Sequence, residues 1–313
     1  MNKPFIKYSI LAISAVVFAL SCGSGSTEQL GNPNTEFTRT IDPQWTAFWN
    51  QGLAEVSSYT LNQARYGEIH QGDAVLIFVT EPFSLSKQVK LDEANSDSKD
   101  YCEVFKMNAI RHFPTGIYDY SVMESVFTPV KSEKAGGTLK ATCSVQDWCG
   151  QVFSQLNLKN DRYRFRQFSY FETESDEDQI LEKAILEDEV WTLLRLNPEL
   201  LPQGVLNMIP SLHFLRFMHL EAVPYPAIAK NEVLTDFSVY TISYSKPKRE
   251  LKIYYNSAFP YEIQGWDETY LDGFGADSKM LTSTAKLKHS MMTDYWDKHG
   301  ISDSTFRKEL MLD

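Results

Sequence analysis

The residues best suited to chemistry lie in the stretch SVQDWCGQVF, residues 144–153, where Cys149 stands between a tryptophan and a glycine. A cysteine attacks as a thiolate, so a nucleophilic cysteine needs a neighbouring base or cation that lowers its pKa. None of the six histidines lies in a recognisable partner motif for Cys149. With Gly150 as a β-bulge, Cys149 instead shares an apolar strand face with Val152 and Leu156. We therefore interpret Cys149 as a packed core residue.

The other cysteines limit covalent chemistry further. Beyond Cys22 the chain has three cysteines, so at most one intramolecular disulfide can form. In one continuous strand Cys143 and Cys149 would lie ~20 Å apart at ~3.3 Å per residue, far beyond the ~7 Å between α-carbons that a disulfide allows. A disulfide from Cys102 to either of them remains open.

Two histidines and a glutamate, His213, His219 and Glu221, fall in a segment that we predict to be a strand, residues 211–223. Zinc takes such ligands, but residues six positions apart on a straight strand do not converge on one ion. The sequence has no H-E-x-x-H or C-x-x-C motif. Its acidic loop ETESDEDQ, residues 172–179, lacks the spacing and the turn glycine of an EF-hand. We expect no metal and no cofactor.

Three arginines alternate with aromatic residues in DRYRFRQF, residues 161–168. In a strand this alternation places Arg162, Arg164 and Arg166 on one face and the aromatic rings on the other. Guanidinium groups beside aromatic rings can hold an anionic ligand, so the three arginines are candidate ligand-facing residues. A half-exposed strand without a ligand has the same pattern, and both interpretations stay open.

The first 21 residues have the features of a secretory signal peptide. Two lysines precede an apolar run, residues 8–20, which is too short for a stable membrane span. The ending Ala-Leu-Ser before Cys22 resembles the lipobox of bacterial lipoproteins, in which cleavage precedes the cysteine. The resemblance implies that acyl chains on Cys22 anchor the protein to a membrane. The polar residues 22–39 predict a flexible tether.

The residues after Cys22 and the net charge bear on location and partners. No aspartate follows Cys22, and no acidic cluster stands in the first residues of the tether. In Gram-negative lipoproteins the lack of this aspartate resembles the default pattern for the outer membrane, and the lack of an acidic cluster argues against export to the cell surface. We therefore expect the protein at the periplasmic face of the outer membrane. Loss of Lys3 and Lys7 with the signal lowers the formal charge from −11 to −13. An acidic chain gains nothing from a phosphate backbone, so we exclude nucleic acid as a partner.

The sequence pattern of the folded part, residues 40–313, predicts mainly β-strands with short helices near both ends. The sequence is 43% hydrophobic and 13% aromatic, which is enough for a core and favours strands. Its clearest strand signal is a hairpin over residues 151–171 that turns at Asn160 and Asp161. We predict helices in IDPQWTAFWNQG (residues 41–52), LEDEVWTLLRLNPELLP (186–202), TAKLKHSMMTDYWDKHG (284–300) and SDSTFRKELML (302–312).

The order of these elements predicts the fold class. Strands do not alternate regularly with long helices, which argues against a doubly wound parallel sheet. We predict a mainly β (α+β) fold with one large antiparallel sheet, curved or partly barrel-like. We interpret residues 40–313 as one β-rich unit, and a subdivision near residues 172–205 is the alternative.

Four runs of the sequence together resemble one known family. They are FWNQGLAEVSSYTLNQARYGE, GDAVLIFVTEPFS, TGIYDYSVMESVFTPV and VQDWCGQVFSQLNLKN. The family consists of Bacteroidota lipoproteins that often carry the label "septum formation inhibitor Maf". True Maf proteins are cytoplasmic nucleotide pyrophosphatases with an S-x-S-x-R-R motif, which this chain lacks. The lipoprotein family has no established catalytic residues, so the resemblance assigns none.

The sequence thus favours a non-catalytic envelope lipoprotein that binds a partner protein, a lipid or a glycan. The competing hypothesis is an envelope hydrolase whose residues converge only in three dimensions, around Cys149 or His219. An apolar groove in the curved sheet would favour a lipid ligand. A closed core with an exposed apolar patch would favour a protein partner.

Overall fold

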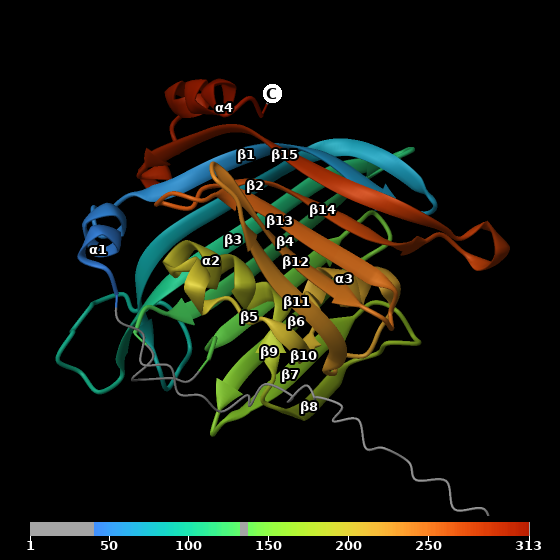
Figure 1. Cartoon of the computed structure of the whole chain (residues 1–313), viewed down its shortest axis with the longest axis horizontal. Helices are drawn as coiled ribbons and strands as arrows, with labels where there is room; N and C mark the ends of the chain where they lie inside the picture. Colours follow the sequence, from blue (N-terminus) through green and yellow to red (C-terminus); the bar gives the residue numbers. More distant parts are fainter. Residues whose placement is uncertain (1–40, 132–136, 313) are drawn as a thin grey trace, which may run out of the picture.

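The computed structural model describes residues 41–131 and 137–312, which form a sheet of 15 strands with short helices (Figure 1). The predicted signal peptide, Cys22 and the predicted tether lie outside the described residues. The strand order is β8-β7-β6-β5-β4-β3-β2-β1-β15-β14-β13-β12-β11-β10-β9, and among the described strands only β9 and β10 pair in parallel. This confirms the predicted mainly β class with a large curved sheet.

Most neighbours in the sheet are joined by short turns, as in a meander. The strands are β1 Ala54–Arg65, β2 Glu68–Ser84, β3 Tyr101–Thr115, β4 Tyr118–Pro129, β5 Lys140–Gln146, β6 Gln151–Lys159, β7 Arg162–Ser169, β8 Glu177–Glu182, β9 Ile185–Leu186, β10 Gly204–Ile209, β11 Tyr225–Val233, β12 Phe237–Tyr244, β13 Arg249–Asn256, β14 Ile263–Asp272 and β15 Lys279–Thr293. The α-helices are α1 Pro43–Trp49, α2 Val190–Leu196, α3 Leu212–Met218 and α4 Thr305–Glu309.

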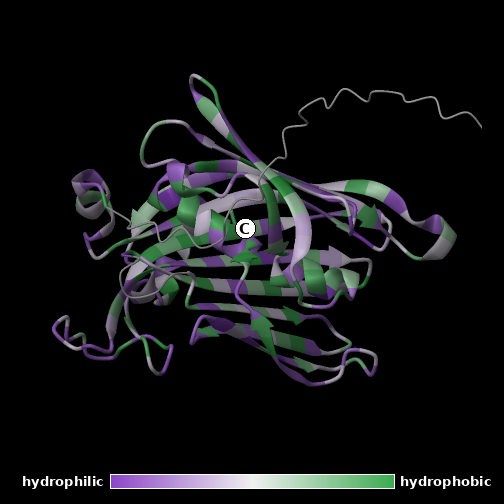
Figure 2. Cartoon of the chain, turned by 60° about the horizontal axis from the view of Figure 1, so that its bottom comes forward, coloured by the Kyte–Doolittle hydropathy of each residue, from purple (hydrophilic) through white to green (hydrophobic). Residues whose placement is uncertain are grey.

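Alternating side chains give the sheet its two faces. Along β13 every second residue is buried, beginning at Arg249, and the residues between them are half-buried. Successive side chains of a strand point to opposite faces, so this pattern marks one inner and one outer surface. Figure 2 shows the same alternation as hydrophobic and hydrophilic bands along the strands.

The sheet curls until its two edges approach each other. Its edge strands are β8 and β9, yet only Lys183 and Ala184 separate them along the chain. Three steps of 3.8 Å between α-carbons bring Glu182 and Ile185 within about 11 Å of each other. In the described part of the chain no ladder joins these two edges, so the sheet is not closed into a barrel. Figure 1 shows α2 and α3 inside the curve and α4 outside it.

The inner helices fill the space that the sheet encloses. Every residue of α2 is buried, and so is every residue of α3 except Met218. A helix that is buried on all sides belongs to the interior of a fold. At one end of the curve α1 inserts Trp45 and Trp49 against Phe105, with ring centroids 5.2 and 4.7 Å away. One continuous apolar cluster therefore connects the helices to the inner face of the sheet.

A buried ion pair fastens α2 to the sheet. Arg195 of α2 donates through both terminal nitrogens to the carboxylate of Glu55 on β1, with Nη2 2.6 Å from Oε2. Its Nε donates to the carbonyl of Pro260 at 3.0 Å. The guanidinium also lies 5.0 Å from the centre of the Trp49 ring and 4.9 Å from that of Phe78. This arrangement compensates a charge that would otherwise be costly to bury.

Several local predictions are confirmed. Asn160 and Asp161 have φ of 50° and 59°, the left-handed values of a tight hairpin turn, and join β6 to β7. Asp42 caps α1 by accepting a hydrogen bond from the N–H of Gln44 at 2.8 Å, with Pro43 as the first helical residue. The predicted helix over 186–202 contains α2.

Two predicted elements are wrong. Residues 211–223 are not a strand, because Ser211 caps α3 and accepts from the N–H of Phe214 at 3.4 Å. Residues 284–300 are not a helix, because β15 occupies their first part and pairs with β1 on one side and β14 on the other. The spacing of Leu287 and Met291, four residues, fits one face of a helix, but in β15 the two residues lie on either side of a register shift in the pairing with β1.

Candidate functional site

The interior holds a chain of six charged side chains that alternate in sign. All six are buried, and each contacts the next. In spatial order they are Glu187, Arg249, Glu268, His213, Glu124 and Arg111. They come from β3, β4, β13, β14, α3 and the turn before α2, so the chain of charges ties both inner helices to opposite parts of the sheet.

The contacts at the centre of this ionic chain are made by His213. Its Nδ1 lies 3.0 Å from Oε1 of Glu124, and its Nε2 lies 3.5 Å from Oε2 of Glu268. Beyond these carboxylates, Arg111 donates to Glu124 at 2.8 Å and Arg249 donates through Nε to Glu268 at 2.9 Å. Each carboxylate therefore stands between two cations, which compensates its burial.

The pKa values follow from this alternation. Burial and Arg111 favour neutral His213, but the charges of Glu124 and Glu268 raise the pKa of His213 to about 9. Burial raises the pKa of Glu124, but His213 and Arg111 outweigh it and lower that pKa to about 2. Three cations and three carboxylates thus balance at neutral pH.

Asp188 is the exception in this group. Burial, and then the charges of Glu124 and Glu187, raise the pKa of Asp188 well above its ordinary value. Its Oδ2 accepts a hydrogen bond from the N–H of Leu212 at 3.3 Å, at the start of α3. The raised pKa favours the neutral form of Asp188, which adds no charge to the ionic chain.

The cavity beside the ionic chain is very small. Its volume is about 10 Å³, and Asp188, Trp191 and His213 contribute to its lining. A cavity of this size has room for about one water molecule, whereas ligand sites in proteins measure ~300–1,000 Å³. This cavity therefore has no space for a lipid or a sugar.

The contacts of His213 with Ser211 and Glu268 are arranged in the same order as those of a serine-hydrolase triad. Ser211 Oγ lies 2.6 Å from Nδ1 of His213, whose other nitrogen faces Glu268. A general base must be neutral, however, and a histidine with a pKa of about 9 carries its proton at neutral pH. Ser211 is buried and also caps α3, so neither group is set up to attack a substrate.

A second histidine cluster lies at the surface. His219 Nδ1 meets Oε1 of Glu174 at 2.5 Å, and Ser169 Oγ donates to the other oxygen of Glu174 at 2.9 Å. The carboxylate thus lies between serine and histidine, whereas nucleophilic catalysis needs the histidine between the other two. His219 and His213 do not meet, because α3 places them at its end and its start.

The prediction that Cys149 is a core residue is wrong. Residues 147–150 form the turn between β5 and β6, and Cys149 is exposed there. Asp147 Oδ1 accepts from the backbone N–H groups of Cys149 and Gly150 at 2.6 and 3.1 Å, which fixes the turn. All three described cysteines are free thiols, and Cys102 and Cys143 are the buried ones.

The three candidate arginines share one face of β7, as predicted. Arg162 pairs with Glu182, and Arg164 pairs with Asp178, both on the edge strand β8. Arg166 is half-buried and donates to the side chain of Asn157 at 3.4 Å. The partners of Arg162 and Arg164 occupy the positions that an anionic ligand would take.

The outer face of β4–β7 and the adjoining turn carry a group of apolar side chains. Met123 and Phe168 are exposed, and they flank half-buried Phe153 in one row across the sheet, with Ser144 between Met123 and Phe153. The ring of Tyr170 lies over Gly150, where an added Cβ would stand 2.5 Å from Cγ of Tyr170.

Trp148 in the same turn is 69% exposed, Tyr170 64% and Phe168 53%. Contiguous exposed apolar patches on a protein surface mark sites where another molecule binds, whereas single exposed apolar side chains are common. We refer to one set of side chains as the aromatic surface: Met123, Trp148, Phe153, Phe168 and Tyr170.

No protein-family model, no curated protein and no solved structure matches the chain. In the described part of the chain no helix is both long and apolar enough to cross a membrane. Within residues 41–131 and 137–312 no three His, Cys, Asp or Glu side chains are placed to hold a metal ion.

Sequence reasoning missed the ionic chain, although a signal for it exists. Glu124 occupies the inward position between Val122 and Val126 on β4, and Arg111 stands likewise between Ala109 and Phe113. A charge among inward apolar residues needs a partner in the core. The sequence does not reveal which charges meet, because four other elements supply the remaining members.

Proposed function

We propose that this protein is a lipid-anchored lipoprotein of the cell envelope that binds a partner protein without catalysing a reaction. Its anchor would be Cys22, and its location the periplasmic face of the outer membrane. The supporting observations are the lipobox-like ending of the signal sequence and the tether that follows it.

The interior of the fold favours a protein partner over a small ligand. Curved sheets can hold small ligands in their concave side, but here the buried helices α2 and α3 lie on that side. The ionic chain satisfies its own charges, and the cavity next to it has room for about one water molecule. Binding is therefore left to the outer surface.

The aromatic surface is the part of the exterior best suited to such binding. Tryptophan and tyrosine dominate the binding energy of protein interfaces, because each buries a large apolar area with few rotatable bonds. Here Tyr170 lies over Gly150, in the turn that carries Trp148 and is fixed by Asp147. A turn fixed by Asp147 needs little ordering upon binding, which favours affinity.

A direct test is the mass of the native protein. The full chain, extracted from its own envelope in a non-ionic detergent, is analysed by native mass spectrometry and by peptide mapping. The proposal expects acyl chains on Cys22 and no stoichiometric lipid or glycan bound elsewhere. The Cys22→Ala variant serves as the control and should lose the acyl chains and the membrane association. A small molecule retained at one copy per chain would contradict a protein-binding role.

A further inference from the structure

The outer face of β4–β7 continues beyond the aromatic surface, and the strand register fixes which side chains share that face. Phe153 and Phe168 stand opposite each other on β6 and β7. Arg166 precedes Phe168 by two residues and so points outward in the next row. Lys140 of β5 lies one row further on, opposite Asn157 of β6. The same face thus carries an apolar row and then two cations, Lys140 and Arg166, which we refer to as the outer cations.

Hydrogen bonds hold the outer cations around two buried amides. Arg166 donates to the side-chain oxygen of Asn157 at 3.4 Å, and Lys140 donates to the backbone carbonyl of Gln88 at 3.2 Å. The side chains of Gln88 and Asn157 are joined to each other by a hydrogen bond, and both residues are buried. Amides are neutral, so none of these contacts cancels a positive charge.

No carboxylate of the described chain forms an ion pair with either outer cation. Asp178 lies opposite Arg166 on β8, but Arg164 holds it through two nitrogens. Burial and the charge of Arg166 lower the pKa of Lys140, which is the direction expected for a cation beside another cation. The buried Nε of Arg166 also lacks a hydrogen-bond partner. The positive charge of the outer cations is therefore available to an anionic group.

We propose that the outer face of β4–β7 binds an extended acidic segment of a partner protein, with apolar residues over the aromatic surface and carboxylates at the outer cations. This inference rests on the proposed function, because it names the partner's chemistry at the same surface. Alternate residues of an extended segment repeat every ~6.8 Å, as do the rows of the sheet beneath it. Carboxylates two and four positions beyond the apolar residues then reach Arg166 and Lys140 in charge-assisted hydrogen bonds.

One carboxylate sets the order of residues within the segment. Asp176 accepts a hydrogen bond from the N–H of Ser169 at 3.3 Å, and Ser169 directly follows Phe168. A second carboxylate at this end of the face would be repelled, whereas apolar residues are tolerated. A segment whose apolar and acidic residues are separated should therefore bind better than one in which they alternate.

Other occupants fit this face less well. A cationic segment would meet the outer cations and be repelled. Anionic membrane surfaces attract clusters of four or more exposed lysines and arginines, whereas here two half-buried cations stand together. The chain's net charge of −11 acts at long range, but at physiological ionic strength charges are screened beyond ~8 Å, so the outer cations dominate within the face.

The test uses three fluorescent peptides and the full mature chain in non-ionic detergent at physiological ionic strength. The separated peptide has leucines in its first half and glutamates in its second half, at alternate positions with serine between them. The glutamine peptide replaces each glutamate by glutamine, and the mixed peptide alternates leucine with glutamate at the same positions. Fluorescence anisotropy should show that the separated peptide binds about tenfold more tightly than either of the others.

Variants locate the binding. Lys140→Gln and Arg166→Gln should each weaken the separated peptide about tenfold and leave the glutamine peptide unchanged, because each removes one charge. Lys140→Arg keeps the charge and should keep the binding. Phe168→Ala should weaken the separated and the glutamine peptides alike, because it removes an exposed ring that both leucine segments cover.

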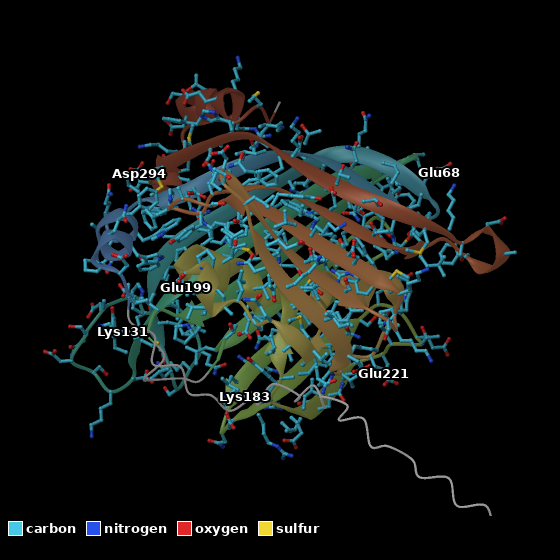
Figure 3. The ribbon with its side chains drawn as sticks, viewed as in Figure 1. Glu68, Lys131, Lys183, Glu199, Glu221 and Asp294 are labelled. Carbon is cyan, nitrogen blue, oxygen red and sulfur yellow. The ribbon has the colours of Figure 1, made fainter. Side chains whose placement is uncertain are left out.

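The matched control is Lys286→Gln, which removes the charge of an exposed lysine on β15. Figure 1 shows β15 at the top of the molecule and β6 and β7 near its bottom. Lys183 after β8 and Asp294 after β15 are likewise far apart in Figure 3. Lys286→Gln should leave the binding of all three peptides unchanged. Circular dichroism confirms that each variant is folded.

Several results would overturn the inference. Equal binding of the separated and glutamine peptides, or binding that ignores Lys140 and Arg166, removes the acidic segment. So does Lys140-dependent binding to vesicles of anionic lipid, or a Lys140-dependent dimer of the chain. If a partner protein cross-links at Trp148 in cells and Lys140→Gln leaves that adduct unchanged, only this inference fails. If no protein cross-links there and no peptide binds, the proposed function fails with it.

Discussion

The imidazole of His213 on α3 and the carboxylate of Glu124 on β4 meet in the core, with Nδ1 and Oε1 3.0 Å apart, although the two residues are 89 positions apart in sequence. Each charge stabilises the other, so the pKa of His213 rises to about 9 and that of Glu124 falls to about 2. Between these values both groups are ionised, and the pair ties α3 to the sheet. The fold's stability should therefore depend on pH through His213.

The first prediction concerns His213→Gln. The folded-state pKa of His213 is above its unfolded value of ~6.5, so its stabilisation is complete below pH ~6.5 and is lost as pH rises through about 9. A difference of ~2.5 pKa units corresponds to about 3 kcal/mol. Urea unfolding should show that the variant is about 3 kcal/mol less stable at pH 6 and much closer to wild type at pH 10. An equal loss at both pH values would refute this account of His213.

Asp188→Asn should be tolerated. The folded pKa of Asp188 is raised, so folding requires proton uptake and this contribution to stability declines as pH rises above its unfolded pKa of ~3.9. Asparagine is neutral and keeps an oxygen that can accept from the N–H of Leu212. The variant should match or exceed wild-type stability at pH 7, and its advantage should grow with pH. A variant that unfolds at pH 7 would show that Asp188 is needed as a carboxylate.

Arg195→Met should be strongly destabilising. It leaves the Glu55 carboxylate buried without its partner, and breaking such a pair costs about 3–5 kcal/mol in the free energy of unfolding. Adding Glu55→Gln should restore part of the loss, because the orphaned charge disappears. The matched control is Lys230→Met, which breaks an exposed pair with Glu232 and should cost at most ~1 kcal/mol. A double variant no more stable than Arg195→Met would contradict the pairing.

Thiol accessibility tests the placement of the described cysteines. Cys149 is exposed in a turn, whereas Cys102 and Cys143 are buried and burial raises the pKa of Cys143. In the mature chain with Cys22 acylated, a maleimide should label one thiol in the folded state and three after unfolding. Cys149→Ser should abolish the labelling of the folded protein. Rapid labelling of two thiols would show that a second cysteine is exposed.

The sequence predicts the elements whose signals are local. Asn160 and Asp161 tolerate the left-handed conformation that a tight turn requires, and Asp42 with Pro43 marks a helix start. These features depend on neighbours within a few residues. The large curved sheet follows from the many aromatic strands, so its class is also accessible from sequence.

Features that depend on residues far away in the chain cannot be predicted from the sequence. The segment LHFLRFM has no period that separates a helix from a buried strand, so the sequence does not reveal that α3 lies inside the curved sheet. Cys149 is exposed because the turn begins at Asp147. The expected bulge at Gly150 keeps Cys149 within a strand, and so places the turn a few residues wrongly. In the aromatic surface Tyr170, which follows β7, lies over Gly150 in the turn between β5 and β6, a contact between separate segments of the chain.

The most direct test of binding through the aromatic surface is photo-crosslinking in living cells. A photoreactive phenylalanine analogue replaces Trp148 in the full lipidated chain, and the same analogue at Ile301 is the control. The account predicts a protein adduct of defined mass from position 148 that position 301 does not give, and that Gly150→Ala suppresses. Identical adducts at both positions, or no protein adduct at position 148, would contradict it.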